Sequence, residues 1–223
     1  GITRDDVVLD VGAGTGKLTA QLAHRSDRVW ALEPSADMRA GFAQALPDFP
    51  SERLLDGSGE SLPVGDASVD VLTYGQSWHW LDTRAAAVEA ARVVRPGGSV
   101  AVVFIQLDVR QPWVHRLSRI MRSGDVHRAD HAPDLRVPGH HGHMERPFTE
   151  PHLHRYVWID PLTVPELIEL GTTRSSWITN SVEGRQRMGA NLEWYIAQQL
   201  GVPSDGVVGI PYQVHCWVAR RAT

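Results

Sequence analysis

Three glycines at alternate positions follow a short apolar run near the start of the chain, and their spacing is suited to binding a small molecule. Val7 to Val11 is apolar and β-branched apart from Leu9 and Asp10, as in a strand buried in a parallel sheet. Gly12, Gly14 and Gly16 come next. Glycine is needed where φ is positive or where a ligand touches the backbone, because a Cβ would collide there. The stretch therefore predicts a strand, a ligand-binding loop and a helix.

The spacing of these glycines separates three kinds of loop. The dinucleotide fingerprint needs a third glycine three residues after the second, where this chain has Lys17. The phosphate loop needs glycine where the chain has Val11, and serine or threonine where it has Leu18. What remains is Asp-x-Gly-x-Gly-x-Gly over residues 10–16. The pattern therefore disfavours a nicotinamide oxidoreductase.

The elements that must position this loop alternate between strand and helix, which predicts an α/β fold with a parallel sheet and right-handed crossovers. The predicted strands are 7–11, 28–32, 53–55, 69–74, 99–105, 155–159 and 210–220. Helices are predicted after Ser35 and Asp82, over 113–121, 164–170 and 172–179, and from Ser181 to Gly201. The capping box Thr163-x-x-Glu166 is expected to start the helix over 164–170, and Gly171 is expected to end it.

Two further segments lie at the carboxyl ends of predicted strands, where open α/β sheets bind their ligands. Glu33 ends the second strand, at a distance from Asp10 that suits an acid accepting both hydroxyls of a ribose. The aromatic segment 75–82 follows the fourth strand, which neighbours the first. Its rings would attract a cation without offering a nucleophile. We expect both segments to face the ligand of the glycine loop.

Composition limits the partners and the compartment. The 223 residues fit one α/β domain over 1–223, and the net charge of -4 without a Lys/Arg run excludes nucleic acid and anionic membrane as expected partners. Cys216 is the only cysteine, which fits a reducing compartment. There is no leader-like start and no apolar run approaching ~20 residues. These observations predict a cytoplasmic protein.

Three motifs resemble the class I S-adenosylmethionine (SAM) methyltransferases, within the methyltransferase type 11 and trans-aconitate methyltransferase-like branch that acts on small molecules. They are the 10–16 loop, Gln76-x-x-His79-Trp80, and the Arg-Pro-Gly-Gly turn at 95–98. The resemblance implies a Rossmann-like, mostly parallel sheet of seven strands in the order 3-2-1-4-5-7-6, with strand 7 antiparallel and helices on both faces. It also implies SAM as methyl donor and S-adenosylhomocysteine as product.

The resemblance also implies roles for individual residues. Those expected to bind the cofactor are Asp10, Gly12, Ala13, Gly14, Gly16, Glu33, Pro34, Met38, Ser58, Gly59, Glu60, Tyr74 and Gln76. Ser58 and Gly59 take the adenine-binding places where relatives more often have Asp and Ala, and Glu60 is either a ligand or a structural acceptor in its loop. Trp78, Trp80 and Arg174 are expected at the methyl acceptor, with core packing the alternative for one tryptophan and surface solvation for Arg174. His79 is either a general base or a histidine bonded to backbone.

The predicted activity is methyl transfer from SAM to an oxygen or nitrogen of a small molecule, a carboxylate among them; the alternative is a SAM-fold binding or regulatory protein without catalysis. The resemblance implies that residues 106–151 are a substrate-side insertion and that helices usually precede the first strand, and we expect those helices to be missing from this sequence. Gly139 to His143 lies in a histidine-rich stretch that lacks a metal-site motif, so no native metal is expected.

Overall fold

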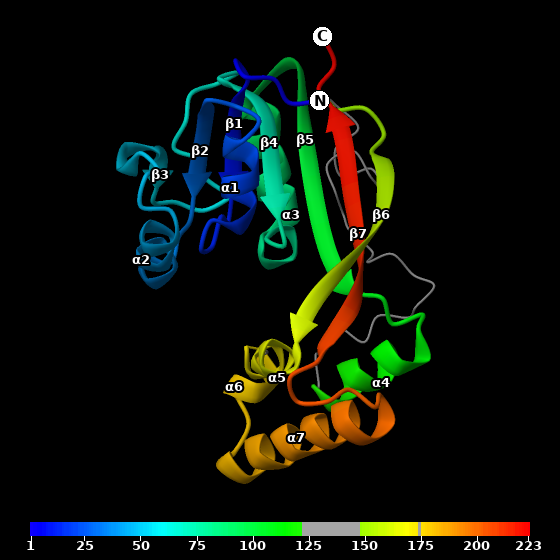
Figure 1. Cartoon of the computed structure of the whole chain (residues 1–223). Coiled ribbons are helices and arrows are strands. Elements are labelled where there is room, and N and C mark those ends of the chain that lie inside the picture. Colours follow the sequence, from blue (N-terminus) through cyan, green and yellow to red (C-terminus); the bar gives the residue numbers. More distant parts are fainter. Residues whose placement is uncertain (122–147, 174) are drawn as a thin grey trace. The chain divides into compact units, whose positions relative to one another are not determined.

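The computed structural model describes residues 1–121, 148–173 and 175–223. Its strands form a seven-stranded sheet of order β3-β2-β1-β4-β5-β7-β6, which confirms the expected order (Figure 1). The strands are β1 (Val7–Val11), β2 (Arg28–Leu32), β3 (Leu54–Leu55), β4 (Val69–Gly75), β5 (Val94–Leu107), β6 (His152–Thr163) and β7 (Val207–Arg220). The helices are α1 (Lys17–Ala23), α2 (Ala36–Ala45), α3 (Thr83–Val93), α4 (Pro112–Ile120), α5 (Val164–Thr172), α6 (Ser175–Ile178) and α7 (Val182–Trp194), with 3₁₀ turns η1 (Ser51–Arg53) and η2 (Trp78–Trp80) and the π-helical turn η3 (Tyr195–Gln199).

The sheet is mixed. β1 pairs in parallel with β2 and β4, β2 with β3, and β4 with β5, so the carboxyl ends of these strands meet at one edge. β7 runs antiparallel to β5, because Gly98 near the start of β5 is hydrogen-bonded to Arg221 just after β7, while Asp108 just after β5 is hydrogen-bonded to Pro211 near the start of β7. The glycine loop, the end of β2 and the end of β4 therefore share one edge, as the sequence predicted.

The described chain divides into two compact units. The first comprises residues 1–104, 148–154 and 215–223, and the second comprises residues 105–121, 155–173 and 175–214. The expected insertion over 106–151 falls largely on residues outside those that the structure describes. The single methyltransferase domain over 1–223 stays a prediction.

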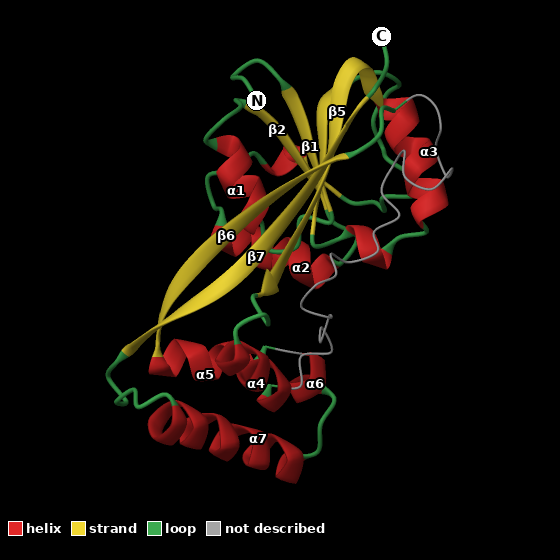
Figure 2. Cartoon of the chain, turned by 90° about the vertical axis from the view of Figure 1, so that its right-hand side faces the viewer, coloured by secondary structure: helices red, strands yellow, loops and turns green. Residues whose placement is uncertain are grey.

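Alternating side chains of β1 explain why helices cover both faces of the sheet in the first unit (Figure 2). Val8 packs with Leu22 of α1, whereas Leu9, its neighbour in the strand, belongs to the cluster that contains Ala86 and Ala90 of α3. All five side chains are at most 7% exposed. This burial holds β1 rigidly, and with it the start of the glycine loop.

Capping residues start the helices where the sequence predicted. The side chains of Ser35 and Asp82 accept backbone N–H groups at the starts of α2 and α3, and Thr163 forms the complete capping box with Glu166. Gly171 was expected to end α5 but lies inside it, buried, where a Cβ would come within 3.0 Å of Leu192. Its small size permits close packing of α5 against α7, so the prediction of a glycine cap was wrong.

The Arg-Pro-Gly-Gly stretch at 95–98 also differs from its expectation. α3 ends at Val93, and β5 begins at Val94, so the four residues belong to the start of a long strand instead of closing the helix. Gly97 nevertheless has a φ of 78°, and its N–H donates to the Arg221 carbonyl. The turn thus serves the pairing of β5 with the end of β7.

Candidate active site

The loop after β1 has the backbone conformation that only glycine adopts freely. Gly12, Gly14 and Gly16 have φ of 70°, 57° and 85°. The N–H groups of Gly12 and Ala13 both donate to the Leu32 carbonyl, at 2.8 and 3.0 Å, which joins the loop to the end of β2. A Cβ on Gly14 would meet nothing within 4 Å. The middle of the loop therefore borders open space, while its flanks are fixed.

Gly12 and Gly16 are glycines because of close packing. A Cβ on Gly12 would collide with the Ser77 side chain, and one on Gly16 would lie 2.7 Å from Leu46 and 2.9 Å from Phe42. Ser77 itself is buried, and its hydroxyl donates to the Val11 carbonyl at 2.5 Å. Sequence reasoning did not single out Ser77, since a serine after a strand carries no signal of this contact.

Glu33 faces the loop from the end of β2. One carboxylate oxygen accepts the Gly14 N–H and the other accepts the Ser35 N–H, both at 2.9 Å, and the residue is only 7% exposed. A carboxylate oxygen can accept more than one hydrogen bond. Glu33 therefore shapes the loop and keeps the capacity to accept ribose hydroxyls.

Asp10 lies beneath the loop and is 1% exposed. Its two carboxylate oxygens accept the hydroxyls of Thr19 and Thr73, at 2.7 and 3.0 Å, so it joins β1 to α1 and β4. Burial raises the pKa of Asp10 to about 6, although both hydrogen bonds favour the ionised form. Its carboxylate is enclosed by protein, and an effect on a cofactor would act through the loop.

Arg39 of α2 connects the ends of β2 and β3. One of its terminal nitrogens donates to the carbonyls of Glu33 and Pro34, at 2.7 and 2.8 Å, and the guanidinium is paired with both oxygens of Asp56. Pro34 and Met38, both expected at the cofactor, are exposed nearby in the chain. The contacts of Arg39 fix the backbone of the segment that contains Pro34 and Met38.

The segment expected to bind adenine forms a tight turn in which the Ser61 N–H donates to the Ser58 carbonyl at 3.1 Å. Gly59 is buried, and a Cβ there would lie 2.7 Å from Leu81. A carboxylate oxygen of Glu60 accepts the Asp82 N–H at 2.9 Å. Of the two alternatives for Glu60, this contact is the structural one.

The end of β4 separates buried from exposed aromatic residues. Trp78 is 1% exposed and meets Tyr74 edge to face, with ring centroids 4.7 Å apart, so its burial favours the packing alternative. The Tyr74 hydroxyl is buried without a hydrogen-bond partner among the described residues. Burial, with smaller contributions from the charges of Glu60 and Glu89, raises its pKa far above the usual value.

Gln76, His79 and Trp80 lie at the surface instead. Gln76 has a φ of 57°, unusual for a residue with a side chain, and its N–H donates to the Val103 carbonyl at 2.9 Å. Trp80 is 78% exposed, and the centroid of the His79 ring lies 4.7 Å from that of Trp80 and 5.8 Å from that of Phe104. The exposed rings of His79 and Trp80 thus follow the buried rings of Tyr74 and Trp78 in the chain.

Two expectations fall on other parts of the chain. Arg174 and the Gly139–His143 run lie outside the described residues. Within the part that the structure describes, no three His, Cys, Asp or Glu side chains are grouped to hold a metal ion. The same part contains no helix long and apolar enough to cross a membrane.

The fold and this edge of the sheet define a class I SAM-dependent methyltransferase. The methyltransferase domain family model matches residues 9–102. The chain is 35% identical to an uncharacterized methyltransferase of Mycobacterium tuberculosis, over 96% of this chain and 83% of the relative. It is 28% identical to an uncharacterized methyltransferase of Schizosaccharomyces pombe, over 86% of this chain and 74% of the relative. The chain therefore belongs to the SAM-dependent methyltransferase family.

Solved structures show the same fold. A putative methyltransferase from Bacillus halodurans has a TM-score of 0.61 at 18% identity, covering 100% of this chain and 95% of that one. Geranyl diphosphate C-methyltransferase from Streptomyces coelicolor, solved with S-adenosyl-L-homocysteine, has a TM-score of 0.51 at 16% identity, covering 99% and 74%. A shorter match, 36% identical over 42% of this chain and 36% of the relative, is a malonyl-[acyl-carrier protein] O-methyltransferase of Pectobacterium atrosepticum.

The residues present fit SAM. The position that a Cβ of Gly14 would occupy is open space, and the Glu33 carboxylate is hydrogen-bonded to the Gly14 N–H. When bound, SAM supplies a methyl group on a positively charged sulfur, together with a neutral leaving group. The loop and Glu33 suit the ribose and methionine parts, and the turn at 58–61 lies beyond the next strand end.

Proposed function

We propose that this methyltransferase transfers the methyl group to an oxygen or nitrogen of a small molecule, with a carboxylate as one candidate acceptor. The observation that carries the proposal is the exposed pair of aromatic rings, His79 and Trp80, at the carboxyl end of β4, the strand beside β1. An aromatic surface there holds a flat or apolar acceptor and attracts a positively charged sulfur. The negative net charge favours a small acceptor over a polyanion.

The chain's own contribution to this reaction is alignment. Transfer of a methyl group is an in-line displacement, and holding the reactants at near-attack distance contributes about 7–11 kcal/mol in favourable cases. A carboxylate acceptor needs no base. A hydroxyl acceptor needs a base to take its proton, and we assign this role to His79, whose exposed ring lies at the carboxyl end of β4.

The cofactor contacts are part of the same proposal. We assign the ribose to Glu33, the methionine part to the loop of Gly12, Gly14 and Gly16, and the adenine to the turn that contains Ser58 and Gly59. The acceptor capacity of Glu33 supports the ribose assignment, and the open space at Gly14 supports the methionine assignment. The hydrogen-bonded turn that follows β3 supports the adenine assignment.

The names of relatives leave the accepting atom to experiment. One relative is named for O-methylation of a malonyl group on acyl-carrier protein, and one structural neighbour for C-methylation of geranyl diphosphate. Radiolabelled SAM with a panel of small carboxylic acids, phenols, amines and prenyl diphosphates tests the proposal. A labelled ester, ether or amine supports it, and a product labelled only at carbon contradicts it.

Two controls sharpen this experiment. Trp80→Ala should lower kcat/KM for the acceptor while leaving the affinity for S-adenosylhomocysteine unchanged, because its exposed side chain is assigned to the acceptor and to the positively charged sulfur, and S-adenosylhomocysteine lacks that charge. SAM binding without any labelled product would favour the non-catalytic alternative. Tight binding of NAD without a response to SAM would contradict both.

A further inference from the structure

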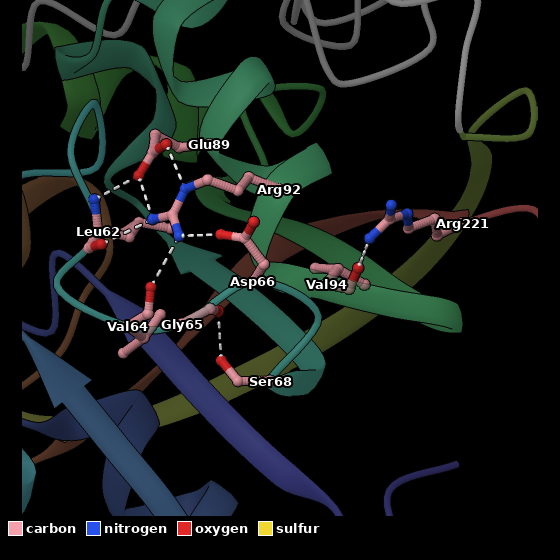
Figure 3. Close-up of polar contacts among 9 residues, drawn as sticks. All are labelled: Leu62, Val64, Gly65, Asp66, Ser68, Glu89, Arg92, Val94 and Arg221. Carbon is pink, nitrogen blue, oxygen red and sulfur yellow. Dashed lines mark hydrogen bonds and ion pairs between the residues drawn. The ribbon is translucent and has the colours of Figure 1, made fainter.

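Arg92 on α3 uses its whole guanidinium to hold the loop that follows the predicted adenine segment (Figure 3). Its Nη1 donates to the Val64 carbonyl and to Asp66, both at 2.8 Å, and its Nη2 donates to the Leu62 carbonyl at 2.8 Å. Nε and Nη2 also form a bidentate pair with Glu89, at 2.8 and 2.7 Å. These contacts place every part of the charged group in a fixed geometry.

Glu89 completes the attachment from the same helix. Its Oε2 also accepts the Leu62 N–H at 2.7 Å, so both backbone polar groups of Leu62 are bonded to side chains of α3. The Leu62 side chain is 4% exposed and belongs to the core cluster that contains Ala86 and Ala90. Leu62 is therefore fixed by three separate contacts, none of which is strand pairing.

A second attachment lies at the other end of α3. Glu60 accepts the Asp82 N–H, and Gly59 packs against Leu81, which precedes the helix. The turn from Ser58 to Ser61 contains this second attachment, and Gly59 also lies close to Val11 of β1. The turn is followed directly by Leu62, so its conformation depends in part on the side chains of Glu89 and Arg92 that hold Leu62.

We propose that Glu89 and Arg92 are positioning residues that hold the turn at 58–61 in the shape that recognises the adenine ring of SAM. This inference rests on the proposed adenine assignment. The two residues touch neither cofactor nor acceptor in this role; they set where the Ser58 hydroxyl and the Gly59 N–H stand. Loosening them should therefore reduce discrimination between nucleobases, beyond any general loss of affinity.

The test compares S-adenosylhomocysteine with S-inosylhomocysteine, in which a carbonyl replaces the exocyclic amine of the purine and N1 carries a hydrogen, so that the donor and the acceptor on this edge are exchanged. Dissociation constants for both are measured by calorimetry with the wild-type protein, Arg92→Lys and Glu89→Gln. The wild type should prefer the adenine compound by about tenfold or more, and both variants should lose most of that preference. The matched control is Arg4→Lys, in the exposed Arg4–Asp27 ion pair, which should keep it.

Each outcome decides between the two assignments. A wild-type protein without preference overturns the adenine assignment, and the positioning role with it. A preference retained in both folded variants overturns the positioning role alone, even where both affinities fall equally. If neither variant folds, hydrogen exchange of the wild type decides: protection of the Leu62 amide before cofactor is added supports a preset turn, and fast exchange there overturns it.

Discussion

The Glu33 carboxylate accepts the backbone N–H of Gly14 at 2.9 Å, so the acid that ends β2 holds the middle of the glycine loop. Its other oxygen accepts the Ser35 N–H at the start of α2. One nearly buried side chain therefore connects the loop, the strand end and the next helix. The same side chain is the one assigned to the ribose, which makes it the most informative site for substitution.

Glu33→Ala should weaken the binding of SAM by about 2–4 kcal/mol, because both the ribose acceptor and the support of the loop are lost. Glu33→Gln retains one acceptor oxygen and should lie between Ala and the wild type. Calorimetric titration with S-adenosylhomocysteine measures both. Glu52→Ala, at an exposed position of η1, is the control and should bind normally. Unchanged affinity in Glu33→Ala would mean that the ribose lies elsewhere.

Gly14→Ala and Gly97→Ala form a matched pair. Both glycines have positive φ, 57° and 78°, and a Cβ at either meets nothing within 4 Å. Each substitution should cost about 1–2 kcal/mol of unfolding free energy from backbone strain. Only Gly14→Ala should lose cofactor affinity, by about tenfold or more, since its Cβ enters the space assigned to SAM. Equal affinities in the two variants would place the cofactor away from the loop.

The pKa of Asp10 predicts a pH dependence of stability. Its folded value of about 6 lies above the ordinary 3.8, so the folded state holds this proton more tightly than the unfolded state does. The stabilisation that it contributes is full below pH 4 and is lost as the pH rises through about 6. The change amounts to about 3 kcal/mol.

Asp10→Asn removes this titration, and comparison with the wild type cancels the opposite slopes of Glu89 and Asp108, whose pKa values are lowered by their arginine partners. Urea unfolding between pH 4 and 7.5 provides the measurement. Any loss of unfolding free energy in the variant, relative to the wild type, should be smallest at high pH, because the wild type itself is destabilised there by the ionised Asp10. A difference independent of pH would show that Asp10 titrates normally.

Tyr74→Phe tests the buried hydroxyl that has no hydrogen-bond partner among the described residues. Without cofactor the variant should be as stable as the wild type or up to about 1 kcal/mol more stable, because no hydrogen bond is removed. If the hydroxyl is satisfied only in the complex, affinity for S-adenosylhomocysteine should fall about tenfold. Tyr156→Phe, at a residue 59% exposed, is the control. Unchanged affinity would leave Tyr74 with packing alone.

The sequence predicted the fold well because its strongest signals are local. The run from Val7 to Val11 and the glycines after it form the predicted strand and loop, and the caps at Ser35 and Asp82 start helices as expected. Gly171 shows the limit of this reasoning. A glycine near a helix end reads as a cap, while the contact with Leu192 that explains it joins residues distant in the chain.

The positions of the candidate site residues at the strand ends were predictable, but their contacts were less so. Asp10 and Glu33 lie where the motif and the strand ends place them, yet the hydroxyls enclosing Asp10 and the Gly14 bond to Glu33 depend on which strands are neighbours. The contact of Ser77 with Gly12 had no signal in residue type. Trp78 and Trp80 share a residue type and a segment, and only the fold shows that one is buried and the other exposed.

A crystal structure of the S-adenosylhomocysteine complex tests most directly whether the glycine loop and Glu33 hold the nucleoside. We expect both ribose hydroxyls within about 3 Å of the Glu33 carboxylate, with the cofactor lying across Gly14. A complex in which Glu33 keeps only the Gly14 and Ser35 N–H groups as partners, with the ribose bound elsewhere, would contradict this assignment.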